Sequence, residues 1–350
     1  KEFMNNQQKK VGRLTKKDSS IVKSMEESGV TQVNVGSDVK QSNWRSSQRN
    51  FKGYTQTLFV KKITQQMIDD NVFPSLFGSG YYNGRTRDSI TNGKKLGTQL
   101  GRKLQVRSES RTLKNSRLDS GRIDKRLIAE LGFGNSKVFS TTFVEQYNDA
   151  ILHISVDASG SMGGDKWRNT MTAVVAICKA ASMISGLDVV VSFRTTHYAG
   201  NRGGQPLVAI GYDSRVDKFR KIETMWPNLY PGGSTPEGLC YEAIMKDFVP
   251  STRNRDSYFL NFSDGMPMFG DDGFEYYGDQ ALQHTKRQVK EIIKKGISVL
   301  SYYVGDDTWS RDTEMTDFKT MYGNDAEFVD VSKVSSLAKT MNNLFLEKGK

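Results

Sequence analysis

The chain has few of the residues that build covalently linked or metal-linked scaffolds. Its 350 residues include only two cysteines, Cys178 and Cys240, both in apolar stretches with helical spacing. So small a number argues against a disulfide framework and favours a reducing cytoplasm, with both thiols buried. The three histidines are too few for a histidine-rich catalytic metal site. We expect His153 in the core of a strand, His197 in a loop and His284 on a solvated helix face.

Long apolar runs and nucleotide-binding motifs are also lacking. No segment is apolar enough to cross a bilayer, and residues 1–17 are polar and basic, unlike a secretory signal. No Gly-x-x-x-x-Gly-Lys-Ser/Thr loop occurs, so we do not expect the chain to hydrolyse ATP by itself. These absences predict a cytoplasmic protein without membrane contact and without a catalytic activity of its own.

The net positive charge comes from the first part of the chain. Residues 1–150 hold 27 lysines and arginines against 14 aspartates and glutamates, whereas residues 151–350 hold 23 against 25. The densest basic stretch, 102–126, is most simply a solvated face. It is also suited to an acidic partner or to nucleic acid. The chain is therefore a basic part joined to a near-neutral part.

The pattern of side chains divides the chain into three. Residues 1–50 are rich in Ser, Asn, Gln and Lys and poor in large apolar side chains, which is typical of a tail or linker. Residues 51–148 are expected to form a basic, mostly helical region, and residues 149–350 a separate domain. The elements expected in the basic region are helices over 57–68, 93–104 and 124–131 and a strand over 138–144.

The third part alternates apolar strands with amphipathic helices. We expect strands over 151–156, 187–193, 206–211, 258–262, 297–304 and 327–331, and helices over 167–184, 236–246, 281–295 and 335–346. This alternation predicts an α/β fold, a doubly wound and mainly parallel sheet of the Rossmann kind with helices on both faces. Ligands of such sheets bind beyond the carboxyl ends of the strands.

Three loops at that edge carry oxygen-bearing side chains. The first, 157–161, follows the first strand; the second, 232–236, precedes a helix; and the third, 263–265, follows the buried strand over 258–262. We expect the loops to meet at one point. Together they offer two carboxylates and three hydroxyls, those of Asp157, Asp264, Ser159, Ser161 and Thr235.

Such a set suits a hard cation. Mg²⁺ prefers octahedral oxygen ligands and keeps several waters. Hydroxyl ligands donate little charge, so the ion stays electrophilic and can take a carboxylate oxygen from another molecule. Taken singly, each side chain has a plainer interpretation: the two aspartates as strand-end residues, the serines as turn formers, and Thr235 as a helix cap before Pro236. All three loops together favour a site for Mg²⁺ or Mn²⁺.

The loop sequences resemble the metal-ion-dependent adhesion site of von Willebrand factor A domains. The motifs are Asp-Ala-Ser-Gly-Ser-Met, Gly-Gly-Ser-Thr-Pro and Phe-Ser-Asp-Gly, in this order along the chain. The resemblance covers residues 149–348. It implies that the same five side chains ligate the ion, Thr235 and Asp264 in part through water, and that the ion bridges to a carboxylate of a partner.

Further motifs accompany the adhesion motif at 157–162: Gly121-Arg122-Ile123-Asp124, Val138-Phe139, Phe193-Arg194-Thr195-Thr196, Gly203-Gly204, Phe262-Ser263-Asp264-Gly265-Met266-Pro267, Asp271-Asp272 and Tyr302-Tyr303-Val304-Gly305. Together they cover about residues 90–348 and resemble the T-subunit of aerobic cobaltochelatase. The long acidic segment usual in that subunit is absent. The resemblance implies a subunit that is no enzyme by itself and works with a ring-forming AAA+ ATPase to remodel a third protein, in that family a metal chelatase.

Two other functions stay open at this point. One is an adhesion or interaction module without an ATPase partner. The other is a nucleic-acid-binding protein that uses the basic first part, although that part shows neither a known recognition module nor interleaved aromatic side chains. The favoured hypothesis is a Mg²⁺-dependent adaptor, whose partners are an AAA+ ATPase and a protein substrate that presents Glu or Asp to the ion.

Overall fold

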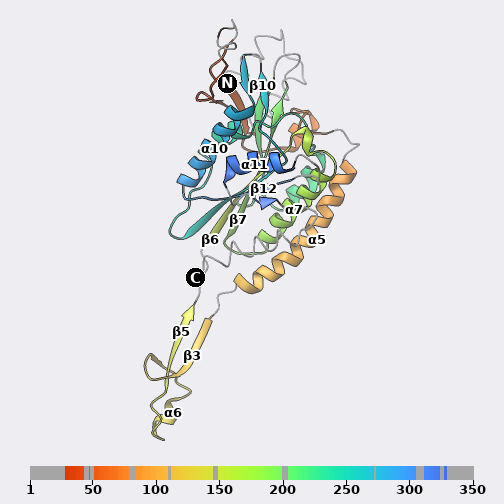
Figure 1. Ribbon diagram of the computed structural model, residues 1–350. Helices are drawn as coiled ribbons and strands as arrows, with labels where there is room; N and C mark the ends of the chain where they lie inside the picture. The colour runs from red at the N-terminus through yellow and green to blue at the C-terminus, as the bar shows by residue number, and fades with distance from the viewer. Residues whose placement is uncertain are drawn as a thin grey trace.

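An eight-stranded sheet forms the centre of the molecule (Figure 1). The computed structural model describes residues 28–42, 47, 51–78, 83–108, 112–144, 149–198, 204–271, 273–304, 311–323 and 327–328. Across the sheet the strands lie in the order β1-β2-β8-β7-β6-β9-β12-β13, and neighbours run parallel except in the β1–β2 and β7–β8 pairs. The strands are β1 (Val30–Val35), β2 (Thr55–Val60), β6 (Asp149–Asp157), β7 (Leu187–His197), β8 (Gln205–Asp213), β9 (Arg255–Ser263), β12 (Ser298–Tyr303) and β13 (Glu327–Phe328). The α/β fold with a mainly parallel sheet is confirmed.

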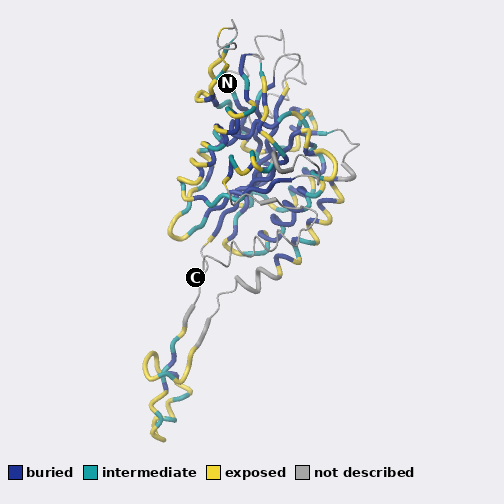
Figure 2. The backbone as a smooth tube through the Cα atoms, in the orientation of Figure 1, coloured by how far each residue is buried: buried dark blue, intermediate teal, exposed yellow. Residues whose placement is uncertain are grey.

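Helices cover both faces of this sheet. Alternate side chains of β9 point to opposite faces, as the period of a strand requires. Leu260 and Phe262 join one buried apolar cluster, whereas Phe259 joins the other. The first cluster also takes side chains from α5 (Asn83–Ser108), α7 (Asp165–Ala181) and α8 (Arg220–Met225). The second takes side chains from α9 (Glu237–Ile244), α10 (Gly278–Lys294) and α11 (Arg311–Tyr322). Figure 2 shows the buried residues gathered along the sheet and the inner sides of these helices.

Helices α5 and α7 approach each other closely because α5 presents glycines. Gly93, Gly97 and Gly101 recur every four residues and therefore share one face of α5. A Cβ at Gly97 would lie 2.5 Å from the carbonyl oxygen of Ala176 in α7. No side chain fits at that distance, so the glycine is what lets the two backbones pack.

Two strands of the main sheet, β1 and β2, come from residues that were expected to precede the domain over 149–350. β1 pairs with β2, and β2 pairs with β8 through Leu58, Phe59 and Val60. The helix expected over 57–68 is wrong: this stretch continues β2, turns, and forms only the short α4 (Gln65–Asp69). The Thr64 hydroxyl, which accepts from the backbone N–H of Met67, caps α4. Thus part of the expected tail and basic region completes the edge of the main sheet.

A second, three-stranded sheet lies apart from the first and contains β3 (Thr112–Leu118), β5 (Phe139–Val144) and β4 (Arg122–Ile123). It is drawn below the main sheet in Figure 1 and carries α6 (Ile128–Leu131) at its far end. The strand expected over 138–144 is confirmed as β5. The helix expected over 124–131 shrinks to the four residues of α6, so the basic region is not mostly helical but holds strands besides α5.

The remaining expectations are met to different degrees. Strands and helices expected between 151 and 304 are all present, the helix over 167–184 as α7 and that over 281–295 as α10. Cys178 and Cys240 are buried free thiols, as expected. The helix expected over 335–346 and most of the 1–50 tail lie outside the described residues. Among the helices that the structure describes, none combines the length and apolar character needed to span a membrane.

Candidate functional site

The first and third loops meet because their strands are neighbours. β6 and β9 run parallel, with Val156 opposite Phe262, so Asp157 and Ser263 leave the sheet at the same edge. The Ser263 hydroxyl donates to Oδ2 of Asp157 at 3.0 Å, and the Ser159 N–H donates to Oδ1 at 2.8 Å. Asp157 is completely buried. Both carboxylate oxygens are thus fixed by the chain around them.

Three oxygens on the outer side of Asp157 form a connected row. Oγ of Ser159 lies 3.0 Å from Oγ of Ser161, which in turn donates to Oδ1 of Asp264 at 2.8 Å. Ser159 and Asp264 are buried, whereas Ser161 is exposed on the short helix η1 (Gly160–Met162). The row therefore has buried residues at both ends and reaches the surface at its middle member, Ser161.

Backbone bonds hold the second loop against the first. The Gly160 N–H donates to the Gly233 carbonyl at 3.0 Å, and the Gly232 N–H donates to the Ala158 carbonyl at 2.8 Å. Gly233 has a φ of 85°, and a Cβ there would lie 2.4 Å from Oγ1 of Thr196, so only glycine fits. Thr235, buried, follows on this loop. The structure thus brings Asp157, Ser159, Ser161 and Asp264 together by direct hydrogen bonds and places the Thr235 loop beside them.

Sequence reasoning missed Lys166, which lies in the first turn of α7. Its Nζ donates to Oδ2 of Asp264 at 2.9 Å, and its side chain is 20% exposed. The ammonium group of Lys166 therefore pairs with one oxygen of Asp264, a carboxylate that was expected to bind a metal ion. No sequence signal marks this contact, because it joins residues 98 positions apart.

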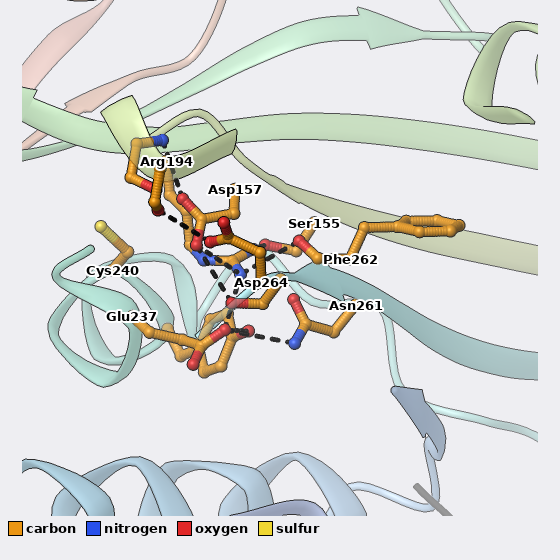
Figure 3. Close-up of polar contacts among 12 residues, drawn as sticks. Ser155, Asp157, Arg194, Glu237, Cys240, Asn261, Phe262 and Asp264 are labelled. Carbon is orange, nitrogen blue, oxygen red and sulfur yellow. Dashed lines mark hydrogen bonds and ion pairs between the residues drawn. The ribbon is translucent and has the colours of Figure 1, made fainter. Parts of the chain in front are cut away.

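A buried ion-pair network, also missed, lies beneath Asp157 (Figure 3). Arg194 of β7 donates from Nη2 to Glu237 at 2.6 Å and from Nη1 to Ser155 at 2.8 Å. Its Nη2 is 3.8 Å from Oδ2 of Asp157. Arg194 and Glu237 are fully buried, and Glu237 also accepts from the hydroxyl of Tyr241 at 3.1 Å. A charge in the middle of an apolar strand must be paired, which is the signal by which Arg194 could have been found.

The charges at this edge do not balance. Three carboxylates, those of Asp157, Glu237 and Asp264, face two basic side chains, Arg194 and Lys166. Burial raises the pKa of Asp157 to about 6; Arg194 opposes this shift, while Asp264 and Glu237 add to it. The site therefore holds a carboxylate whose negative charge its neighbours only partly neutralise.

The donor set fits a small divalent cation. Neighbouring ligands of an octahedral Mg²⁺ with bonds of about 2.1 Å lie about 3.0 Å apart. The oxygens of Ser159, Ser161 and Asp264 are spaced at 3.0 and 2.8 Å, close to this value. A dication here would also supply the positive charge that Asp157 lacks. These side chains offer hydroxyl and carboxylate oxygens, the ligands that a hard cation prefers.

His197, at the end of β7, is not one of the ligands of the candidate metal site. It was expected in a loop, but it belongs to β7, is buried and stacks edge-on against Phe73 with ring centroids 5.2 Å apart. Burial lowers the pKa of His197 to about 4. The ring is therefore neutral near pH 7 and acts as a core side chain.

The mainly parallel sheet, with the three loops at its carboxyl edge, fits a von Willebrand factor A-like domain. Comparison with protein-family models and with curated proteins gives no match. Similar solved structures include the pilus adhesin SpaC from Lactobacillus rhamnosus GG, in an open form (14% identity over 58% of this chain, TM-score 0.42) and in a second form (13% over 58%, TM-score 0.40). Human COPII-coat protein Sec24c is another (9% over 57%, TM-score 0.36). The chain covers only 31–32% of each of these proteins. At this level of similarity the comparison assigns neither a family nor a partner.

Proposed function

We propose that this chain is a protein-binding adaptor that holds Mg²⁺ or Mn²⁺ at Asp157, Ser159, Ser161, Thr235 and Asp264 and bridges through the ion to a carboxylate of a partner. One observation supports the proposal above all. The buried Asp157 carboxylate lacks full charge compensation and lies next to a row of hydroxyl and carboxylate oxygens at ligand spacing. The middle member of the row, Ser161, is exposed, so a partner can reach the row there.

The kind of partner follows from the chemistry of the edge. An ion held largely by hydroxyls keeps its Lewis acidity and exchangeable waters. A Glu or Asp side chain that replaces one water gains a charge-assisted contact at a partly dehydrated site.

The resemblance to the T-subunit of aerobic cobaltochelatase supports a finer proposal. The partner is then a ring-forming AAA+ ATPase or the protein that this ATPase remodels. An adaptor of this kind has no catalytic activity by itself. The motif Phe193-Arg194-Thr195-Thr196 that contributes to the resemblance contains the buried Arg194 beneath the site.

Co-purification from the native host tests the proposal. The expected result is recovery of an AAA+ ATPase with the wild-type chain in Mg²⁺, and its loss with EDTA or with Asp264→Ala. Asp165→Asn is the matched control, since Asp165 is an exposed carboxylate of the neighbouring helix α7. Equal recovery of the partner under all four conditions would show that the ion does not bridge.

A further inference from the structure

Three metal-ligating side chains from distant parts of the chain converge in a second cluster. None of them belongs to the adhesion edge, that is, the sheet edge with Asp157, Ser159, Ser161 and Asp264. Asp38 follows β1, Glu242 belongs to α9 and His284 to α10. Nε2 of His284 lies 3.1 Å from Oε2 of Glu242 and 3.3 Å from Oδ1 of Asp38. His284 is fully buried, so the expectation of a solvated helix residue is wrong.

The spacing of these atoms matches a coordination shell. Zn²⁺ binds imidazole nitrogen and carboxylate oxygen at about 2.0–2.1 Å, so neighbouring ligands of a tetrahedral ion lie about 3.3 Å apart. The two measured separations agree with this value, and all three ligand atoms lie within 4.8 Å of one another. Little movement of the side chains would be needed to surround an ion.

Each of the three side chains is held in place by a further hydrogen bond. The Gly36 N–H donates to Oε2 of Glu242 at 2.8 Å, and Nε of Arg287 donates to Oδ2 of Asp38 at 2.8 Å. Nδ1 of His284 lies 3.0 Å from the hydroxyl of Tyr276. Partners of this kind orient the ligands of metal sites and fix the histidine tautomer.

One tautomer of His284 suits a metal ligand. The Tyr276 hydroxyl lies 3.3 Å from the Ala281 carbonyl, 3.0 Å from Oγ1 of Thr285 and 3.0 Å from Nδ1 of His284. When it accepts from Nδ1–H, the Nε2 lone pair of His284 points toward the two carboxylates, and the side-chain amide of Gln288 lies 3.3 Å from Nε2. A cation between these groups offsets the repulsion between the lone pair and the carboxylates, whereas in the other tautomer Nε2–H donates to a carboxylate and no cation is needed.

We infer that Asp38, Glu242 and His284 form a second metal site, which takes a transition-metal dication of the Zn²⁺ class. The imidazole ligand distinguishes it from the all-oxygen adhesion edge, because nitrogen ligands favour Zn²⁺ over Mg²⁺. The Asp38 side chain is 48% exposed and that of Glu242 27%, so an ion and a water ligand can enter from solvent. A bound ion clamps the segment after β1 onto α9 and α10. The alternative is a cluster without metal, in which Nε2–H of His284 donates to the carboxylates of Glu242 and Asp38.

Titration of the metal-free full chain with Zn²⁺, in excess Mg²⁺ that occupies oxygen-only sites, distinguishes the two accounts. The metal site predicts one Zn²⁺ bound per chain, a rise in Tm, and visible absorption of a four-coordinate ion when Co²⁺ replaces Zn²⁺. Asp38→Asn and His284→Gln should each weaken Zn²⁺ binding at least tenfold. Asp38 is exposed, so its variant keeps the test valid if the buried His284 variant does not fold. Tyr276→Phe should weaken binding about tenfold, through loss of ligand orientation.

Two controls make the outcome specific to this cluster. Glu291→Gln removes another carboxylate of α10, one that is 51% exposed, and should bind Zn²⁺ as the wild type does. Asp264→Asn should also retain Zn²⁺ binding, which separates this site from the proposed adhesion site. The inference is overturned if the wild type binds no Zn²⁺ under these conditions. It is equally overturned if Asp38→Asn lowers Tm but binds Zn²⁺ with wild-type affinity. That result would show that Asp38 only stabilises the fold through its ion pair with Arg287.

Discussion

The guanidinium of Arg194 lies 3.8 Å from the carboxylate of Asp157, and neither side chain is exposed to solvent. The same guanidinium bonds Glu237 at 2.6 Å, so one buried cation serves two buried anions. Burial opposes its charge, but the neighbouring anions hold the pKa of Arg194 above its usual value. Arg194 therefore supports the candidate metal site from within the core, while the exposed Ser161 lines it from the solvent side.

Removal of Arg194 should destabilise the fold strongly. Arg194→Met leaves two buried carboxylates without their cation, and loss of one partner of a buried ion pair costs about 3–5 kcal/mol. Urea unfolding followed by circular dichroism measures this change. Arg215→Met breaks the more exposed pair with Asp213 and should cost about 1 kcal/mol or less. If both variants lose the same small amount, Arg194 is not the buried counter-ion that the structure indicates.

The affinity for Mg²⁺ should fall as the pH is lowered through about 6. Asp157 must lose its proton to meet the ion, and burial raises its pKa to about 6, so protons compete below that value. Between about pH 7.5 and about pH 5 we expect a loss of about tenfold in affinity, measured by titration calorimetry. Without metal, the pH dependence of the folding stability has the opposite sign to that of the Mg²⁺ affinity. Because the folded pKa is raised, protonation favours the folded state, and the unfavourable contribution of this carboxyl is relieved as the pH falls through 6. Equal Mg²⁺ affinity at both pH values would contradict the assignment of Asp157.

Lys166 should compete with the metal ion for Asp264. Lys166→Met removes the ammonium group that lies 2.9 Å from Oδ2 of Asp264, so this carboxylate becomes free to face the ion. We expect the Mg²⁺ affinity to rise several-fold at low salt. Arg168→Met is the matched control, since Arg168 lies on the same helix and pairs with the exposed Asp165 instead. A fall in Mg²⁺ affinity in Lys166→Met would mean that Lys166 positions Asp264 for the metal and does not compete with it.

The glycine face of α5 should be intolerant of the smallest side chain. In Gly97→Ala the new Cβ meets the carbonyl oxygen of Ala176 at 2.5 Å, so α5 and α7 must separate. Overpacking of this kind costs about 1–3 kcal/mol, although alanine favours a helix over glycine. Gln99→Ala, on the exposed face of the same helix, should change the unfolding free energy little. Higher stability of Gly97→Ala would contradict the close packing of the two helices.

The sequence predicted the strand–helix alternation after residue 149 because each strand there is a nearly continuous apolar run between turn residues. A helix was wrongly predicted over 57–68 because the apolar residues of this segment fit a helical face. The run Thr-Leu-Phe-Val is instead rich in β-branched and aromatic residues, and its pairing with β8 makes it a strand. Such pairing is a tertiary effect that local spacing does not contain.

The residues of the candidate site also fall into those that the sequence predicted and those that it missed. The oxygens of Asp157, Ser159, Ser161 and Asp264 follow strand ends, so motif and topology were enough to bring them together. Lys166 and Glu237 enter through contacts between helix ends and strands, and nothing in their neighbouring residues marks them. The His284 cluster was missed because α10 looks like an ordinary amphipathic helix, whereas the segment that buries the ring against Asp38 comes from the other end of the chain.

Calorimetric titration of the full chain with Mg²⁺ shows whether the adhesion edge binds a metal ion. Wild type, Asp264→Asn and Asp165→Asn are compared, with circular dichroism as the check on folding. We expect one Mg²⁺ per chain in the wild type and in Asp165→Asn, and an affinity at least tenfold lower in Asp264→Asn. If the folded wild type binds no Mg²⁺, or if all three proteins bind it with the same affinity, these residues do not form a metal site.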